Sequence, residues 1–101
     1  MADPMWTPLI HAVVANDPAR VLEHIQRGAD VNETDRLGWT PLAHASYDGY
    51  NDIVRLLLRN GADQTIRDTE GSTPLLHAQV AGYAETALIL VYHRCAPEMI
   101  H

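Results

Sequence analysis

Residues 35–45 read DRLGWTPLAHA, and most of this stretch returns 33 residues further on as residues 68–78, DTEGSTPLLHA. Residues 7–12, TPLIHA, carry the same Thr-Pro-Leu and His-Ala groups 33 residues earlier. A second block, Gly-Ala-Asp, stands at residues 28–30 and again, at the same spacing, at residues 61–63. A constant period of this length is typical of proteins built by stacking one structural unit on the next.

Each Thr-Pro pair predicts the start of a helix. The threonine hydroxyl can cap the helix, and proline at the first helical position lacks only an N–H that would be unpaired anyway. Gly49 and Gly82 are expected to end two of these first helices. Second helices are expected to begin at Asp17, at Asn51 and near Ala84, with the Asp and Asn side chains as caps.

The segments between the helix pairs predict tight turns. Gly28 and Gly61 are expected to close the second helices in the left-handed conformation that other residues resist. Segments 31–39 and 64–72 contain Asp-x-x-Gly and are interpreted as β-turn hairpins. The residues therefore predict three helix-turn-helix units joined by hairpins.

This pattern resembles the ankyrin repeat, a unit of the form D-x-x-G-x-T-P-L-H-x-A followed by a helix that ends in L-L-x-x-G-A-D. The resemblance covers about residues 5–96. It implies an all-α solenoid, an ankyrin-like stack of three repeats in which each repeat buries its apolar face against its neighbours. The predicted organisation is one domain, residues 1–101, with repeats at about 5–34, 35–67 and 68–96 and a short tail at 97–101.

Composition and charge exclude several classes of function. The 101 residues include 7 Lys plus Arg and 13 Asp plus Glu, for a net charge of −6, which disfavours binding to nucleic acid. No apolar run is long enough to span a bilayer, so no membrane partner is expected. One cysteine, Cys95, allows no intramolecular disulfide, and no secretory signal is visible. A reducing, cytoplasmic location is therefore expected.

Neither a catalytic site nor a metal or cofactor site is predicted. The chain has no phosphate-binding glycine loop and no nucleophile elbow. His11, His44 and His77 form a ladder at one position per repeat, and packed helices about 8–10 Å apart hold such residues too far from one another to share an ion. Each imidazole is expected to bond the backbone of an adjacent hairpin. A C-terminal group has suitable ligand types but no established zinc spacing: His93, Cys95, Glu98 and His101.

The resemblance implies that a protein partner meets the concave side, at the hairpin tips and the exposed edge of the first helices. The residues carried over to that side are Trp6, Arg36, Leu37, Trp39, Tyr47, Asp48, Thr69, Glu70, Ser72 and Val80. Arg36, Trp39 and Tyr47 are of the types enriched in binding hot spots, and Arg36 could pair with a partner carboxylate. Alternatively, Trp39 packs onto the neighbouring repeat and Trp6 packs at the open end.

The predicted function is a non-enzymatic protein-binding module whose acidic charge favours a basic partner. A first alternative is a small inhibitor or immunity-type protein that occludes a target enzyme or toxin. A second alternative rests on Leu88 and Tyr92, which lie four residues apart on the last helix and form a secondary apolar face directed outward. The tail, a partner or a second copy of the chain could cover this face, so the protein is expected to be a monomer or a weak homodimer.

Overall fold

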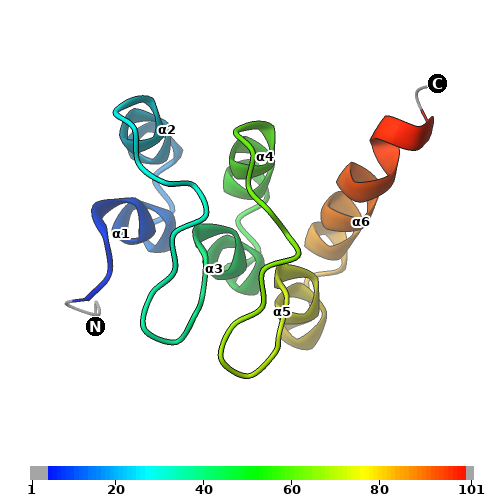
Figure 1. The fold of residues 1–101 in the computed structure, drawn as a ribbon. Coiled ribbons are helices and arrows are strands. Elements are labelled where there is room, and N and C mark those ends of the chain that lie inside the picture. Colours follow the sequence, from blue (N-terminus) through cyan, green and yellow to red (C-terminus); the bar gives the residue numbers. More distant parts are fainter. Residues whose placement is uncertain (1–4, 100–101) are drawn as a thin grey trace.

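The computed structural model describes the backbone of residues 5–99 and the side chains of residues 5–94. These residues form the helices α1 (Pro8–Val14), α2 (Pro18–Gln26), α3 (Pro41–Asp48), α4 (Asn51–Arg59), α5 (Pro74–Ala81) and α6 (Ala84–Met99). In Figure 1, α1, α3 and α5 lie in one row, and α2, α4 and α6 lie in a second row. No strand is present within residues 5–99, and the predicted all-α stack of three ankyrin-like repeats is confirmed.

The first helix of each pair begins as predicted. The hydroxyl oxygens of Thr7, Thr40 and Thr73 accept hydrogen bonds from the backbone N–H three residues further on, across 3.2, 3.0 and 3.3 Å. Gly49 and Gly82 end α3 and α5 with φ of 71° and 85°, in the left-handed region. The Thr-Pro and Gly positions therefore set both ends of α3 and α5 through local chemistry.

The predicted capping role of Asn51 is wrong. Tyr50 occupies the N-cap of α4, and Asn51 is the first residue of the helix. The side chain of Asn51 reaches α6 instead: Nδ2 donates to Oε2 of Glu85 across 2.8 Å, and Oδ1 accepts from the hydroxyl of Thr86. Asn51 therefore ties the second repeat to the third through partners 34 and 35 residues away in the chain.

The last helix continues past the point where the sequence pattern stops. Arg94 stands where Gly28 and Gly61 turn the chain after α2 and α4, and α6 runs on to Met99. Residues 97–99, expected as a tail, continue the helix, and residues 100–101 lie outside the described part of the chain.

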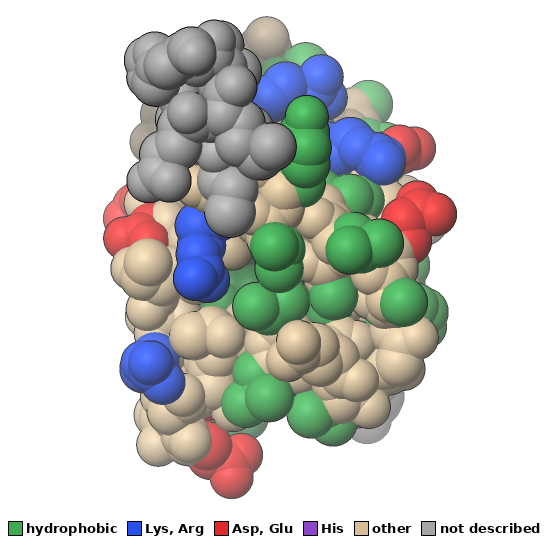
Figure 2. Space-filling view, turned by 90° about the vertical axis from the view of Figure 1, so that its right-hand side faces the viewer, with side chains coloured by type: hydrophobic (Ala, Val, Ile, Leu, Met, Phe, Trp, Pro, Cys, Tyr) green, Lys and Arg blue, Asp and Glu red, His purple; other side chains and the backbone are tan. Residues whose placement is uncertain are grey.

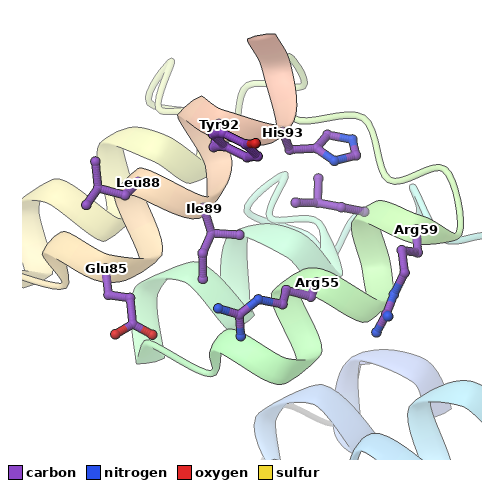
Figure 3. Close-up of a pocket in the computed structure, with 8 residues that line it drawn as sticks. Arg55, Arg59, Glu85, Leu88, Ile89, Tyr92 and His93 are labelled. Atoms are coloured by element: carbon purple, nitrogen blue, oxygen red, sulfur yellow. The ribbon is translucent and has the colours of Figure 1, made fainter. Parts of the chain in front are cut away.

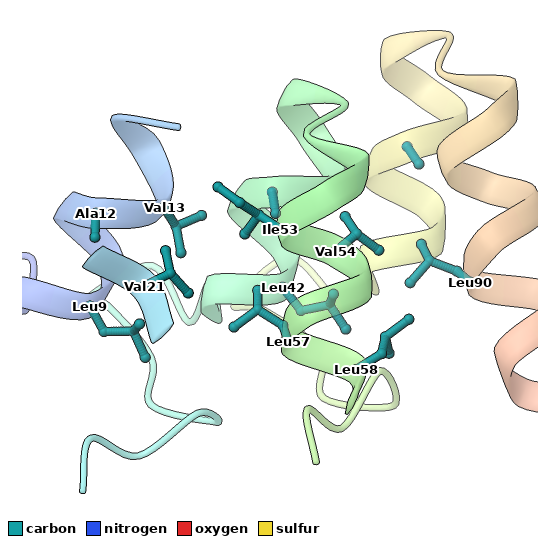
Figure 4. Packing of buried hydrophobic residues seen from close by; sticks show 12 residues of the cluster. Leu9, Ala12, Val13, Val21, Leu42, Ile53, Val54, Leu57, Leu58 and Leu90 are labelled. Carbon is teal, nitrogen blue, oxygen red and sulfur yellow. The ribbon is translucent and has the colours of Figure 1, made fainter. Parts of the chain in front are cut away.

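Hydrophobic side chains from all three helix pairs form one continuous core (Figure 4). Small residues occupy the same buried position in the first helices, Ala12 in α1, Ala45 in α3 and Ala78 in α5, which lets these helices pack closely. Larger side chains fill the space toward the second helices; they include Leu9, Val13, Val21, Leu42, Ile53, Val54, Leu57 and Leu90. Within residues 5–99, no helix combines the length and the hydrophobicity needed to cross a membrane.

Gly49 and Gly82 offer a matched test of how tightly the repeats pack. A Cβ atom added at Gly49 would lie 2.7 Å from the ring of Tyr83 in the next repeat, whereas one added at Gly82 would meet nothing within 4 Å. We expect Gly82→Ala to cost about 1–2 kcal/mol, because alanine resists positive φ. Gly49→Ala should cost at least about 1 kcal/mol more, since the methyl group also overpacks the ring. Urea unfolding of both variants measures this difference, and equal losses would contradict the close contact.

Candidate protein-binding surface

The residues predicted to meet a partner lie along one side of the stack, on the hairpins and the first helices (Figure 1). We call this surface the recognition face. Its exposed members are Arg36, Leu37, Tyr47, Thr69, Glu70 and Val80, and its half-buried members are Trp6, Trp39, Asp48 and Ser72.

A buried carboxylate organises each of the two complete hairpins. Oδ1 of Asp35 accepts hydrogen bonds from the backbone N–H groups of Leu37 and Trp39, both across 3.0 Å. Nε2 of His44 donates to the other oxygen of Asp35 across 2.8 Å. Asp68 repeats this arrangement in the third repeat, with His77 at 2.8 Å. Each pair therefore fixes a hairpin to the helix that follows it.

These contacts correct the predicted role of two histidines. His44 and His77 bond a carboxylate of their own repeat and not the backbone of an adjacent hairpin. The period that relates Asp35 to Asp68 was visible in the sequence, but only folding shows that these side chains point at the imidazoles.

The two carboxyl groups titrate below their ordinary range. Burial by itself would raise the pKa of Asp35, but the hydrogen bonds from His44 and from the N–H groups of Trp39 and Leu37 outweigh it and lower that pKa. Burial likewise acts to raise the pKa of Asp68, and hydrogen bonds led by the N–H of Ser72 lower it. Both side chains are therefore ionised at neutral pH.

Tryptophan and histidine rings alternate along the stack. The ring of Trp6 lies 5.5 Å from His11 and 5.4 Å from His44, measured between centroids. The ring of Trp39 lies 5.0 Å from His44 and 4.0 Å from His77. We call these five residues the Trp–His ladder. Trp39 therefore packs onto the neighbouring repeat, as the packing alternative predicted, while part of its surface stays accessible.

Exposed apolar side chains flank the Trp–His ladder. Tyr47 packs edge-on against Trp39 at 5.4 Å, and its side chain remains 47% exposed. Leu37, on a hairpin, is 60% exposed and Val80, on α5, is 74% exposed. The N–H of Thr69 donates to the carbonyl of Leu37 across 3.0 Å and joins the two hairpins. The face thus presents apolar groups on a backbone that is already held in place.

A second surface lies between α4 and α6 on the other row of helices. It is a groove of about 630 Å³ lined by Arg55, Leu58, Arg59, Glu85, Leu88, Ile89, Tyr92 and His93 (Figure 3). Leu88 and Tyr92, the predicted secondary apolar face, are both exposed. Sequence reasoning did not place Arg55 and Arg59 in this groove, because they come from the preceding repeat. The predicted cover by the tail falls on side chains outside the described residues.

Within the described side chains, no three His, Cys, Asp or Glu residues lie close enough together to hold a metal ion. Of the C-terminal candidates, Cys95, Glu98 and His101 have side chains outside the described part of the chain.

Comparison with known proteins agrees with this architecture. The family model for ankyrin repeats (3 copies) matches residues 9–99, which include all six described helices apart from the first residue of α1. No curated protein matched the chain. From its helix pairs, its hairpins and this match, the chain belongs to the ankyrin-repeat family.

Proposed function

We propose that this protein binds a protein partner through its recognition face. Ankyrin repeats are generally protein–protein interaction modules, and the family is typically non-enzymatic. The observation that carries the choice of surface is the Trp–His ladder, fixed by the Asp35–His44 and Asp68–His77 pairs and flanked by exposed apolar side chains. A surface held in place before binding loses little conformational freedom when a partner docks.

Charge supports a partner with a basic surface. The net charge of −6 would steer a cationic protein toward the chain and would raise the association rate more than the affinity. Binding on this face should therefore slow as ionic strength rises. The inhibitor or immunity-type alternative stays a prediction, and the activity of the partner inside the complex would decide it.

Removing the two exposed apolar side chains that flank the ladder should weaken partner binding. We expect Leu37→Ala combined with Tyr47→Ala to raise the Kd about tenfold or more, because exposed aromatic and aliphatic anchors carry much of the energy of such contacts. The fold should persist, since neither side chain is buried. Pull-down followed by calorimetry with the purified partner measures the effect.

Leu88→Ala with Tyr92→Ala is the matched control, because it removes a Leu and a Tyr of similar exposure from the groove between α4 and α6. This variant should bind as the parent does. A partner lost from the control and retained by the first variant would place recognition in the groove and refute the proposal.

A further inference from the structure

The two ends of the stack differ in chemistry. At the N-terminal end, α2 presents charged side chains paired with one another: Arg20 with Asp17 across 3.5 Å, and Arg27 with Glu23 across 3.0 Å. Arg20 is exposed, whereas its counterpart in the second repeat, Ile53, is fully buried. Water can therefore solvate this end of the stack, as expected of a capping repeat.

The C-terminal end has no such cap. Ile10 and Ala43 occupy one position of the first helix and are 0% and 4% exposed, because the next repeat covers them. Leu76 occupies the same position in the third repeat and is 42% exposed. In the second helix, Leu58 is 5% exposed and its counterpart Val91 is 42% exposed. The third repeat thus exposes side chains of the kind that join one repeat to the next.

These residues form a continuous surface, which we call the end face: Leu75, Leu76, Gln79, Tyr83, Ala87 and Val91. Figure 2 looks onto this end of the stack, where hydrophobic side chains cluster. A groove of about 480 Å³ crosses the end face, and none of the described residues that line it is charged. Gly82 borders this groove with open space where its counterpart Gly49 meets a tyrosine ring.

We propose that the end face binds the end face of a second copy of this chain, forming a two-fold symmetric dimer. Two copies that each carry a net charge of −6 can approach here, because the described groove residues set no like charges against one another. A head-to-tail array is disfavoured, since the N-terminal end offers Asp17 and Arg20 where Tyr83 and Thr86 of the third repeat pack against the second. A contact that uses the same face in both copies closes at two.

This dimer leaves the recognition face open. Val80 lies one turn after Leu76 on α5, and its counterpart Tyr47 stays exposed although another repeat follows. The position of Val80 is thus not one that stacking covers. The dimer would present two recognition faces to partners, so its existence can be tested without knowing any partner.

The test is sedimentation velocity of the full chain from micromolar to millimolar concentration. The parent should pass from monomer to dimer. Leu76→Glu should raise the dimer dissociation constant at least about tenfold, because a carboxylate would lose its hydration in an apolar contact. Val91→Glu should do the same from α6. Val80→Glu adds the same charge to α5 and should dimerise as the parent does, and circular dichroism confirms that each variant is folded.

Three outcomes would overturn the proposal. The parent could remain monomeric throughout the concentration range, or it could form species that grow beyond a dimer. Alternatively, Leu76→Glu and Val91→Glu could dimerise normally while Leu88→Arg with Tyr92→Arg does not, which would move the contact to the groove between α4 and α6. None of these results would affect partner binding at Leu37 and Tyr47, so the two proposals can fail separately.

Discussion

Replacing Leu57 with alanine should lower the free energy of unfolding by about 2–5 kcal/mol, the range for removing a fully buried leucine and leaving a cavity. Leu57 is 0% exposed and lies on α4, in the central repeat, within the continuous core. Because each repeat contacts only its neighbours, a defect there weakens both interfaces between repeats. A loss of this size is a large share of the stability of about 5–15 kcal/mol that is usual for a protein domain.

Urea unfolding followed by far-ultraviolet circular dichroism measures the effect. Leu88→Ala is the control, since it removes the same atoms from an exposed position of α6 and should change stability by less than about 0.5 kcal/mol. Similar midpoints for the two variants would mean that the core is not continuous through the central repeat.

Replacing Asp35 with alanine should cost about 2–4 kcal/mol, because three donors lose their acceptor at a net value of about 1 kcal/mol for each bond. The side chains of Asp35 and His44 are only 4% and 12% exposed, so water replaces the carboxylate poorly. Asp35→Asn should cost less, since the amide oxygen can still accept from the hairpin N–H groups. Chemical unfolding of both variants at neutral pH provides the comparison.

The same carboxylates should make stability depend on pH. The pKa values of Asp35 and Asp68 are lowered on folding, so their contribution is fully present above the unfolded pKa of about 4 and is lost as pH falls through the lowered values. The double variant Asp35→Asn with Asp68→Asn should therefore lose less stability than the parent on acidification. Parallel slopes for the two proteins below about pH 4 would show that the hairpin carboxylates do not contribute.

The parts of the fold that sequence reasoning predicted correctly are those set by neighbours along the chain. Thr40 and Pro41 start α3, and Gly49 ends it, through bonds that span only a few residues. The errors concern side chains whose partners lie further away. Asn51 could cap α4 or bond α6, and its short polar side chain suits both, so only the packing of the third repeat decides.

The candidate surfaces were predicted less completely for a similar reason. The period placed Tyr47 and Val80 on one side of the stack, but it did not show that Asp35 and Asp68 hold the hairpins behind them. The end face was not predicted either. Exposure of Leu76 depends on whether another repeat covers it, and its neighbours in sequence are much like those of buried Ala43.

The hydrogen bond between neighbouring hairpins limits how this chain can change length over evolution. The carbonyl of Leu37 meets the N–H of Thr69, and a Cβ atom added at Gly38 would lie 3.0 Å from the backbone of Asp68. Inserting one residue in a hairpin would shift these groups out of register and leave polar backbone unsatisfied. Duplicating or deleting a whole unit of 33 residues keeps every such group opposite its partner. Gene variants with one repeat more or fewer can therefore fold, whereas short insertions at the hairpin bases would be removed by selection.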